Sequence, residues 1–260
     1  MKALRMDINA DMGESYGRWT LGADAELMPF LTSANVACGY HGGDPHVMRT
    51  TVRLAREHGV AVGAHVALPD LLGFGRRLMA ITPEDLKDYV VYQVGALRAF
   101  AAAEGIPIQH VKPHGALYVM CTEDERYARA VVEALGELGE ELILLLSGEL
   151  VAAAARKAGV PFVAEGYIDL DYDAAGKLVI ERVKRMREPT EVARRAVLLA
   201  CEGRVPSPEG PVTFTAQSVC VHGDAPNAPA VAKAVREALL AAGVELVPLA
   251  RLMRSREEGR

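Results

Sequence analysis

Acidic and amide side chains alternate close to the N-terminus, in the segment DINADMGE. Within a strand, Asp7, Asn9 and Asp11 would share one face, and Glu14 would follow at the strand end. Carboxylates held close together repel one another, so we expect at least one of them to have a raised pKa or to bind a cation. A general acid/base pair or a hard-metal site has this requirement. The alternative is that Asp11 and Glu14 cap the following turn and that Asn9 satisfies backbone groups.

A glycine-rich segment, NVACGYHGGDPHVM, holds the next candidates. His41 lies between glycines, which let a ligand approach the main chain, and it has little core to fill. Asp44 followed by Pro45 is a helix-start signal, so Asp44 is either an N-cap or a substrate-binding residue. His46 would lie in the first helical turn, as a structural or exposed side chain.

Basic side chains lie where further strands are expected to end. His65 closes the apolar segment VAVGAH, and Lys112 and His114 flank Pro113 in HVKPHG. A lysine among apolar strand residues is costly to bury unless it pairs with an acid or meets an anionic ligand. Lys112 and His114 are therefore candidate functional residues, whereas His110 is consistent with a core histidine.

The last expected strand repeats this pattern, with His222 and Asp224 on either side of Gly223. One histidine at a strand end carries little information, but several on one rim are hard to explain by packing alone. The histidines at expected strand ends are His41, His65, His114 and His222.

Short motifs do not decide the chemistry. The sequence has no HExxH segment, so zinc or another divalent ion would take its ligands from separate strands. The candidate ligands are His41, His65, His114 and Asp7. There is no GxSxG elbow and no P-loop for a nucleotide. Beside the segment GFG, Arg76 and Arg77 either clamp a carboxylate or phosphate or are ordinary loop arginines.

These residues must be positioned by short apolar runs of strand length that alternate with longer segments of helical spacing. The expected strands are Leu4–Ile8, Ala34–Cys38, Val60–Ala64, Ile108–Val111, Leu142–Leu146, Pro161–Ala164 and Ser218–Val221. The expected helices are His46–His58, Pro83–Glu104, Asp124–Leu138, Leu150–Ala158, Thr190–Glu202 and Ala228–Ala242.

About seven β-α units predict a mainly parallel sheet, either closed as a barrel or open and doubly wound. The polar residues favour the barrel, because the strand ends of a parallel barrel open onto one face, where active sites are built. We therefore expect an α/β protein with one domain over residues 1–260, a seven-stranded parallel (β/α) barrel with a core of about 4–250. Longer loops are expected near 67–80, near 168–189, with a hairpin about Ala175–Gly176, and near 203–215.

The composition fits a globular protein. Half of the 260 residues are apolar and 24% are charged, and 29 basic against 34 acidic side chains give a net charge of −5. This balance excludes intrinsic disorder and argues against binding nucleic acid. The four cysteines are widely spaced, and no apolar run suits a signal peptide or a membrane span. We expect a soluble, cytoplasmic protein without a membrane partner.

Six sequence blocks together resemble the LamB/YcsF family. They are DINADMGESYGRWTLG, SANVACGYHGGDPHVMRTTV, GVAVGAHVALPDLLGFGRR, YQVGALRAF, HVKPHGALY and SVCVHGD, and they extend from Asp7 to about Val244 in family order. The resemblance implies a seven-stranded (β/α) barrel similar to the polysaccharide-deacetylase barrels. It also implies ATP-dependent cleavage of 5-oxo-L-proline to L-glutamate, as the A component of a 5-oxoprolinase that works with subunits B and C. ATP is then a co-substrate, with Mg²⁺ as its possible metal.

The implied reaction gives expected roles to the matching acids and bases. Asp7 or Glu14 would activate water, and His114 or His222 would protonate the nitrogen of the opening ring. Among the other matching positions, His41 is expected to act in catalysis. The remaining matching positions expected to bind substrate are Asn9, Asp44, His65 and Asp224.

The same reaction needs cations for developing charge and for the substrate carboxylate. Lys112 would stabilise the developing charge, and Arg76 or Arg77 would hold the carboxylate. The chain departs from the family after Ala164, where it has EGYIDLDY and Leu170 replaces an arginine. If that arginine holds substrate in relatives, Arg76 or Lys112 must serve here, or the specificity differs.

Two rival functions stand beside this one. The first is a metal-dependent amide hydrolase, such as a deacetylase, which uses histidine and aspartate ligands on the same rim. The second is a non-catalytic subunit that binds 5-oxoproline or organises the complex while a partner performs the chemistry.

Overall fold

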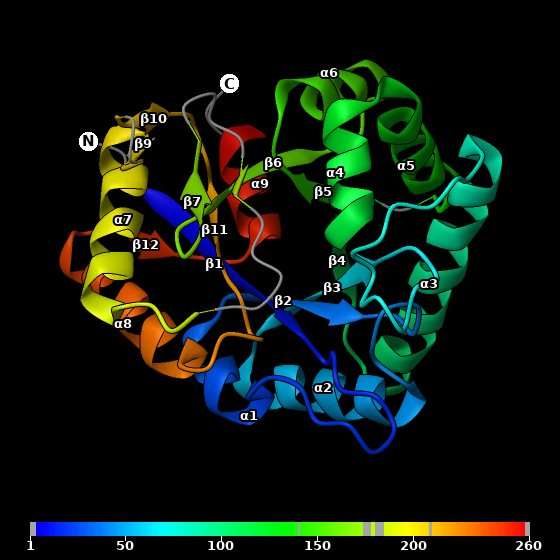
Figure 1. The fold of residues 1–260 in the computed structure, drawn as a ribbon, viewed down its shortest axis with the longest axis horizontal. Coiled ribbons are helices and arrows are strands. Elements are labelled where there is room, and N and C mark those ends of the chain that lie inside the picture. The colour runs from blue at the N-terminus through cyan, green and yellow to red at the C-terminus, as the bar shows by residue number, and fades with distance from the viewer. Residues whose placement is uncertain (1–3, 140, 174–177, 180–184, 208–209, 258–260) are drawn as a thin grey trace. The chain divides into compact units, whose positions relative to one another are not determined.

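A computed structural model describes residues 4–139, 141–173, 178–179, 185–207 and 210–257 of the chain. In this part of the chain, seven parallel strands form a closed barrel with helices around it, labelled in Figure 1. The barrel strands are β1 (Arg5–Met12), β2 (Ser33–Ala37), β3 (Ala61–Val66), β4 (Ile108–Pro113), β5 (Ile143–Leu146), β6 (Phe162–Tyr167) and β11 (Ser218–Val221). The predicted seven-stranded parallel (β/α) barrel is confirmed.

The strand order around the barrel is β11-β6-β5-β4-β3-β2-β1, and a pairing of β1 with β11 closes it. That closing pair places Asp7 opposite Ser218 and Asn9 opposite Cys220. Between β3 and β4, His65 lies opposite Lys112. A short further strand, β12 (Glu245–Leu246), pairs in parallel with the beginning of β1.

Contacts divide the chain into two compact units. The first unit comprises Met1–Ala10, Gly22–Ser33 and Glu165–Arg260, and the second comprises Asp11–Leu21 and Ala34–Ala164. The expectation of one domain with a core of about 4–250 stays a prediction, and the units are described in turn.

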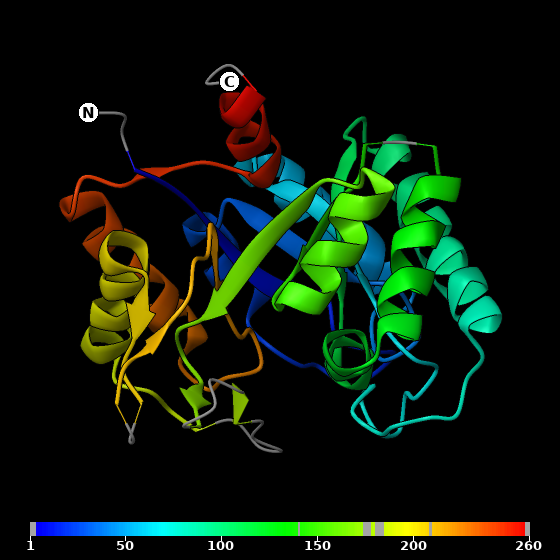
Figure 2. The same ribbon diagram turned by 90° about the horizontal axis from the view of Figure 1, so that it is seen from above.

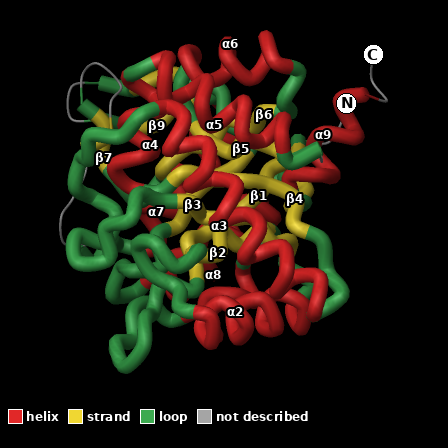
Figure 3. The backbone as a smooth tube through the Cα atoms, turned by 90° about the vertical axis from the view of Figure 1, so that its right-hand side faces the viewer, coloured by secondary structure: helices red, strands yellow, loops and turns green. Residues whose placement is uncertain are grey.

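The second unit carries the longer helices, which were largely predicted from their spacing. These helices are α2 (Pro45–His58), α3 (Pro83–Ala103), α4 (Gly115–Glu123), α5 (Glu125–Glu137) and α6 (Glu149–Ala158). Helix α5 packs against α3, α4 and α6, and α3 lies beside strand β3 (Figures 1 and 3). The buried face of α5 is made of small and aliphatic side chains such as Ala128, Val131 and Leu135. Burial of this apolar face provides most of the stabilisation of such a helix.

Helix ends in this unit follow the signals in the sequence. The Asp44 carboxylate caps α2 by accepting from the backbone N–H groups of His46 and Val47. Thr82 caps α3 by accepting from the N–H of Asp85. Helix α2 ends at Gly59, whose φ of 66° lies in the left-handed region that favours glycine.

Strand β1 corrects one expectation about where the polar residues lie. It runs to Met12, four residues beyond Ile8, where the apolar run was expected to stop. Asp7 and Asn9 therefore lie inside the strand instead of at its end. Their neighbours on the other face, such as Ile8, are fully buried, so both faces of β1 are covered.

The first unit contains helices α1 (Asp24–Leu27), α7 (Pro189–Glu202), α8 (Ala228–Ala241) and α9 (Leu249–Glu257), with a 3-10 turn, η1, at Met28–Phe30. Helices α7 and α8 pack side by side (Figure 2, yellow and orange). Two antiparallel pairs lie in the expected loops: β7 (Asp171–Tyr172) with β8 (Leu178–Val179), and β9 (Arg204–Val205) with β10 (Val212–Thr213). The predicted turn at Ala175–Gly176 lies outside the described residues. Among the described helices, none is both long and apolar enough to cross a membrane.

Candidate active site

Four side chains of the second unit converge in a buried cluster, which we call the Glu14–histidine cluster: Glu14, His41, His65 and His114. Glu14 follows β1, His41 lies in the glycine-rich loop after β2, His65 lies within β3 and His114 follows β4 directly. None of these residues is more than 8% exposed. Each offers one ligand atom, and these atoms all lie within 4.8 Å of one another. The cluster therefore has the composition and the compactness of a site for acid–base chemistry or for a metal ion.

One carboxylate oxygen of Glu14 faces all three imidazoles. Its Oε1 lies 2.9 Å from Nε2 of His41, 3.6 Å from Nδ1 of His114 and 3.9 Å from Nε2 of His65. Only the first of these distances is a hydrogen bond, which Nε2–H of His41 donates. Glu14 is thus anchored by His41 and presents the same oxygen to His65 and His114.

Backbone carbonyls fix the tautomers of the other two histidines. Nδ1 of His65 lies 3.0 Å from the carbonyl oxygen of Lys112, and Nε2 of His114 lies 2.8 Å from that of Phe74. A carbonyl only accepts, so each of these ring nitrogens carries the hydrogen and donates it. The remaining nitrogens, Nε2 of His65 and Nδ1 of His114, face each other at 3.0 Å.

Ring contacts hold the histidines in place. The imidazoles of His41 and His114 stack, with centroids 3.9 Å apart and planes 10° apart. Phe74 places its ring edge-on to both, at 5.4 Å from His41 and 5.1 Å from His114. Burial, together with the charge of neighbouring histidines, lowers the pKa of His41 and His114 well below its usual value. Both imidazoles are therefore neutral at neutral pH.

A second layer of polar groups surrounds the cluster in the same unit. The ammonium of Lys112, which is 1% exposed, donates to Oδ1 of Asp11 at 3.0 Å. Asn35 donates to the same oxygen at 2.9 Å, and His110 donates through Nε2 to the amide oxygen of Asn35 at 2.7 Å. Nε2 of His65 lies 3.4 Å from Oδ1 of Asp11 and so connects this layer with the cluster. The charge of the buried lysine is balanced by the aspartate.

Two glycines allow close packing around this layer and over the cluster. Gly63 of β3 lies against the ring of His110, where a Cβ atom would be 2.2 Å from the imidazole. Gly75 lies over His114, with room for no side chain, and its carbonyl oxygen accepts from the N–H of Ala116 at 2.8 Å. The loop 67–80 therefore covers His114 directly.

The arginines of this loop have partners within it. Arg77 donates to the buried carboxylate of Asp70, and this hydrogen bond lowers the pKa of Asp70. The guanidinium of Arg76 lies 5.0 Å from the centroid of the Phe74 ring, a cation–π contact. Arg76 thus lies close to the residue whose carbonyl orients His114, whereas Arg77 is held by Asp70. Their roles as a carboxylate clamp stay predictions.

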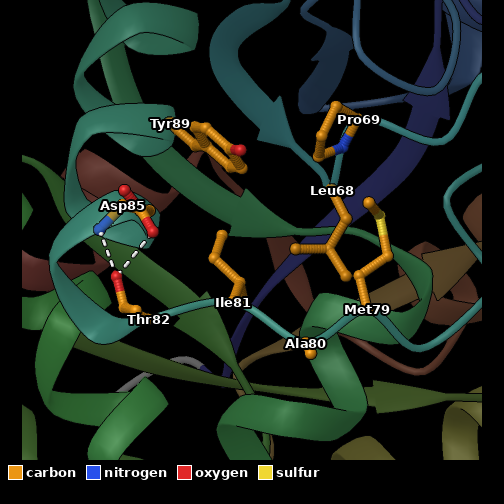
Figure 4. Close-up of a pocket in the computed structure, with 8 residues that line it drawn as sticks. All are labelled: Leu68, Pro69, Met79, Ala80, Ile81, Thr82, Asp85 and Tyr89. Carbon is orange, nitrogen blue, oxygen red and sulfur yellow. Dashed lines mark hydrogen bonds between the residues drawn. The ribbon is translucent and has the colours of Figure 1, made fainter.

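A pocket of about 350 Å³ lies between the loop 67–80 and the beginning of α3 (Figure 4). Its lining residues are Leu68, Pro69, Met79, Ala80, Ile81, Thr82, Asp85 and Tyr89. Most of these side chains are apolar, and its two polar members, Thr82 and Asp85, are hydrogen-bonded to each other at the helix cap. No member of the Glu14–histidine cluster lines it, so we place the chemistry at the cluster and not in this pocket.

In the first unit, Asp7 begins a separate buried network. Its carboxylate accepts hydrogen bonds from the hydroxyls of Thr32, at 2.7 Å, Ser33, at 2.6 Å, and Ser218. Burial raises the pKa of Asp7 from 3.8 to about 6, against the lowering effect of these three donors. Asp7 can therefore exchange a proton close to neutral pH. Its role as a metal ligand stays a prediction.

The network continues through Asn9 to Glu165. The amide of Asn9 donates to Oγ of Ser218 at 2.7 Å and lies 3.5 Å from Oε2 of Glu165. The hydroxyl of Tyr167 donates to the other oxygen of Glu165 at 3.0 Å. The ring of Tyr167 stacks on that of His222, with centroids 5.4 Å apart.

His222 is oriented by Asp169, within the segment that departs from the family pattern. Its Nδ1 lies 2.9 Å from Oδ1 of Asp169, and its backbone N–H donates to Oδ2 at 2.8 Å. Leu170, in the position of the family arginine, is buried. Asp224 lies two residues beyond His222, in the turn before α8, and is half-buried.

The candidate list from the sequence therefore divides into three groups. The structure brings together Glu14, His41, His65, Lys112 and His114, and it places Asp7, Asn9 and His222 in the network of the first unit. Asp44 caps a helix, and Gly17 also donates to its carboxylate at 2.7 Å. The residues that the sequence analysis did not select are Asn35, Asp70, Phe74, Glu165, Asp169 and Ser218. Alternation along β2 could have suggested Asn35, but the role of Phe74 is that of a backbone carbonyl, which residue type does not reveal.

Fold and site together define a (β/α)-barrel protein with a buried carboxylate–histidine centre, an arrangement suited to proton transfer in hydrolysis. Comparison with known proteins then places it more narrowly. The chain belongs to the LamB/YcsF family, whose model matches residues 6–254.

Relatives of known name and structure agree with this placement. A Thermus thermophilus protein, named as the A component of 5-oxoprolinase, is 48% identical over 247 residues, which cover 94% of this chain and 99% of that protein. The crystal structure of a lactam utilization protein from Thermus thermophilus matches with a TM-score of 0.88 and 46% identity, covering 94% of this chain and 100% of that one. A variant of a Bacillus subtilis peptidoglycan deacetylase matches with a TM-score of 0.50 and 11% identity, covering 99% and 93%. The last match concerns the fold alone and confirms its predicted likeness to deacetylase barrels.

Proposed function

We propose that this chain is the A component of an ATP-dependent 5-oxoprolinase. The reaction converts 5-oxo-L-proline, ATP and two water molecules to L-glutamate, ADP and phosphate. The observation that carries the proposal is the 48% identity, over nearly the whole length of both chains, with a protein named as this component of 5-oxoprolinase. The buried Glu14–histidine cluster supports it, because lactam opening needs proton transfer at a site shielded from bulk water.

The chemistry sets the requirements for the site. A lactam is a resonance-stabilised amide, so transfer of the γ-phosphoryl group of ATP to the carbonyl oxygen makes the ring carbon easier for water to attack. Water adds, the C–N bond breaks, the ring nitrogen takes up a proton, and phosphate leaves. A base for the water, an acid for the nitrogen and a cation for the developing charge are all required.

The residues supply these roles as follows. Glu14 or Asp7 accepts the proton of the water, since Glu14 is held at hydrogen-bonding distance by His41 and the pKa of Asp7 is about 6. His114 or His222 protonates the nitrogen. Lys112, whose ammonium is held by Asp11, stabilises negative charge near the cluster.

Nucleotide and partner subunits belong to the same proposal. The sequence has no P-loop, so we place ATP, with its Mg²⁺, at a surface that a partner completes. The word "subunit" in the names of the relatives supports an assembly, and we propose that subunits B and C are its other members.

The test of the proposal is the ATP-dependent release of glutamate from 5-oxoproline. The assay uses this chain alone, subunits B and C alone, and all three together. We expect activity in the full mixture only, with one ADP formed for each glutamate. Absence of activity in a mixture whose three proteins are folded and assembled would overturn the proposal.

A pair of matched variants then tests the cluster. Glu14→Gln keeps the size of the side chain and removes its charge, and we expect kcat of the full mixture to fall by about 10²–10⁴-fold. The control is Glu57→Gln, at an exposed position of helix α2. The control should keep the kcat of the wild type, and full activity of Glu14→Gln would exclude a role for Glu14 in the chemistry.

A further inference from the structure

We propose that Glu14, His65 and His114 bind one divalent transition-metal ion of the zinc type, and that His41 positions Glu14 for this purpose. The inference rests on the geometry of the cluster and does not depend on the reaction proposed above.

The first observation concerns the two nitrogens that face each other. Nδ1 of His65 and Nε2 of His114 give their hydrogens to backbone carbonyl oxygens at 3.0 and 2.8 Å. In the neutral imidazoles, Nε2 of His65 and Nδ1 of His114 then have lone pairs and no hydrogen, yet they lie 3.0 Å apart in a buried site. Two acceptors at this distance repel each other unless a cation lies between them. Donation from the second ring nitrogen to a carbonyl is also the usual support of a metal-ligating histidine.

The second observation concerns distances. Nε2 of His65, Nδ1 of His114 and Oε1 of Glu14 form a triangle with sides of 3.0, 3.6 and 3.9 Å. The circle through three such points has a radius of about 2.1 Å, so one point in their plane is equally distant from all three. Bonds from zinc to imidazole nitrogen and carboxylate oxygen are about 2.0–2.2 Å long. The three atoms are thus already spaced as ligands of one ion.

His41 has a different part. Its ring lies parallel to that of His114 at 3.9 Å, so the in-plane lone pairs of the two rings run side by side and do not meet at one ion. Its Nε2–H donates to Oε1 of Glu14, and its Nδ1 has no hydrogen-bond partner among the described residues. The bond to Glu14 is therefore the polar contact that holds the ring, and it fixes the carboxylate in turn. We assign His41 as a positioning residue.

Charge and ligand type select the class of ion. The carboxylates of Glu14 and Asp11 carry two negative charges against the single positive charge of Lys112, which leaves a net attraction for a cation. Two imidazoles and one carboxylate suit Zn²⁺ and the neighbouring transition metals, whereas Mg²⁺ and Ca²⁺ prefer sites made of oxygen. With Glu14 as a ligand, Asp7 becomes the favoured base for the water.

The test uses the full-length chain without a polyhistidine tag. The protein is treated with a chelator, dialysed and titrated with Zn²⁺ by calorimetry, and the bound metal is counted by elemental analysis. We expect one Zn²⁺ per chain, a concentration-dependent rise in melting temperature, and no comparable effect of Mg²⁺. Co²⁺ should bind at the same site and give visible absorption bands.

Matched variants make the assignment specific. Glu14→Gln and His41→Asn should each weaken Zn²⁺ binding by at least about 10–100-fold. Both should keep the far-UV circular dichroism and the urea midpoint of the chelator-treated wild type. His58→Asn, at an exposed position of helix α2, removes a histidine elsewhere and should bind Zn²⁺ as the wild type does.

Either of two results would overturn the inference: no stoichiometric binding of Zn²⁺ or Co²⁺, which would leave a shared proton between His65 and His114, or unchanged binding by Glu14→Gln. The outcome is separate from that of the glutamate assay. Binding of one ion by a chain that releases no glutamate with its partners would overturn the proposed reaction and keep the site.

Discussion

Lys112 and Asp7 are two fully buried ionisable side chains that are accommodated in different ways. Lys112 gives its ammonium to the carboxylate of Asp11, so charge is balanced by charge. Within the described part of the chain, Asp7 receives its hydrogen bonds from hydroxyl groups, and its pKa rises to about 6. Burial of an unpaired carboxylate favours its protonated form, which explains the direction of this shift.

The raised pKa of Asp7 predicts a pH dependence of stability. A carboxyl group that holds its proton more tightly when folded stabilises the protein fully below the unfolded pKa of 3.8, and this contribution is lost as the pH rises through about 6. We expect the free energy of unfolding of the wild type to fall by about 3 kcal/mol between pH 4 and pH 7 relative to that of Asp7→Asn. Urea denaturation of both proteins across this range measures the difference.

The control for this experiment is Asp88→Asn, because Asp88 is exposed on helix α3. Its unfolding free energy should follow that of the wild type at every pH. Parallel curves for the wild type and Asp7→Asn would contradict the assignment of a raised pKa to Asp7.

At the residue scale, the sequence predicted the members of the site better than their partners. His41, His65 and His114 were chosen because each follows or ends an apolar run, and all three lie in one cluster. The orientation of His114 depends on the carbonyl oxygen of Phe74, a non-glycine residue with a φ of 53°. Every residue has a carbonyl group, so only the loop conformation could reveal this contact.

At the scale of elements, the segment that carries His41 depends on the close approach of three loops. Gly43 has a φ of 78°, and a Cβ atom there would lie 2.6 Å from the carbonyl oxygen of Ala37 and 2.8 Å from that of Gly13. These neighbours are backbone atoms, which cannot move aside as a flexible side chain can. The glycine is therefore required by space as well as by conformation.

Two alanine substitutions separate these requirements. Gly59→Ala, at a φ of 66° with no atom within 4 Å of the added Cβ, should cost about 1–2 kcal/mol for conformation alone. Gly43→Ala should destabilise the protein by about 1–3 kcal/mol more, because the contact with backbone is added. Urea unfolding measures both, and equal losses for the two variants would contradict the packing argument.

Periodicity predicted the amphipathic elements and failed where burial is uniform. Helix α4, with the sequence GALYVMCTE, was not predicted, because it is apolar on most sides and shows no polar face. Strand β1 was predicted too short for the opposite reason, since Asp7 and Asn9 are polar and nevertheless buried. Both errors come from judging burial by polarity, which fails where polar side chains have partners inside the barrel.

At the scale of the whole molecule, the barrel could be predicted because strands and helices alternate with few exceptions and because chemically active residues recur at strand ends. The division into two compact units could not, since it depends on contacts between distant segments. The same holds for the closing pair of β1 with β11, whose residues are more than 200 positions apart in the sequence.

The cysteines give a prediction that concerns both units. All four are free, and Cys38, Cys121 and Cys220 are buried whereas Cys201 is exposed. Burial raises the pKa of Cys38 to about 12 and also raises that of Cys121, so these thiols react slowly while the protein is folded. Titration with a thiol reagent should find one reactive group in the native protein and four after denaturation. The variant Cys201→Ser should lose the native reaction, and a second fast thiol in the folded protein would contradict the described core.

The hydrogen bond between the carbonyl of Phe74 and Nε2 of His114 has one more consequence. The loop 67–80 covers His114 and, through this bond, also decides which of its nitrogens carries the hydrogen. Any movement of the loop that uncovers the cluster removes this acceptor and frees the imidazole to exchange its two tautomers. Entry of a molecule and the loss of a defined proton position are therefore the same event, and the site regains its working form only when the loop has closed again.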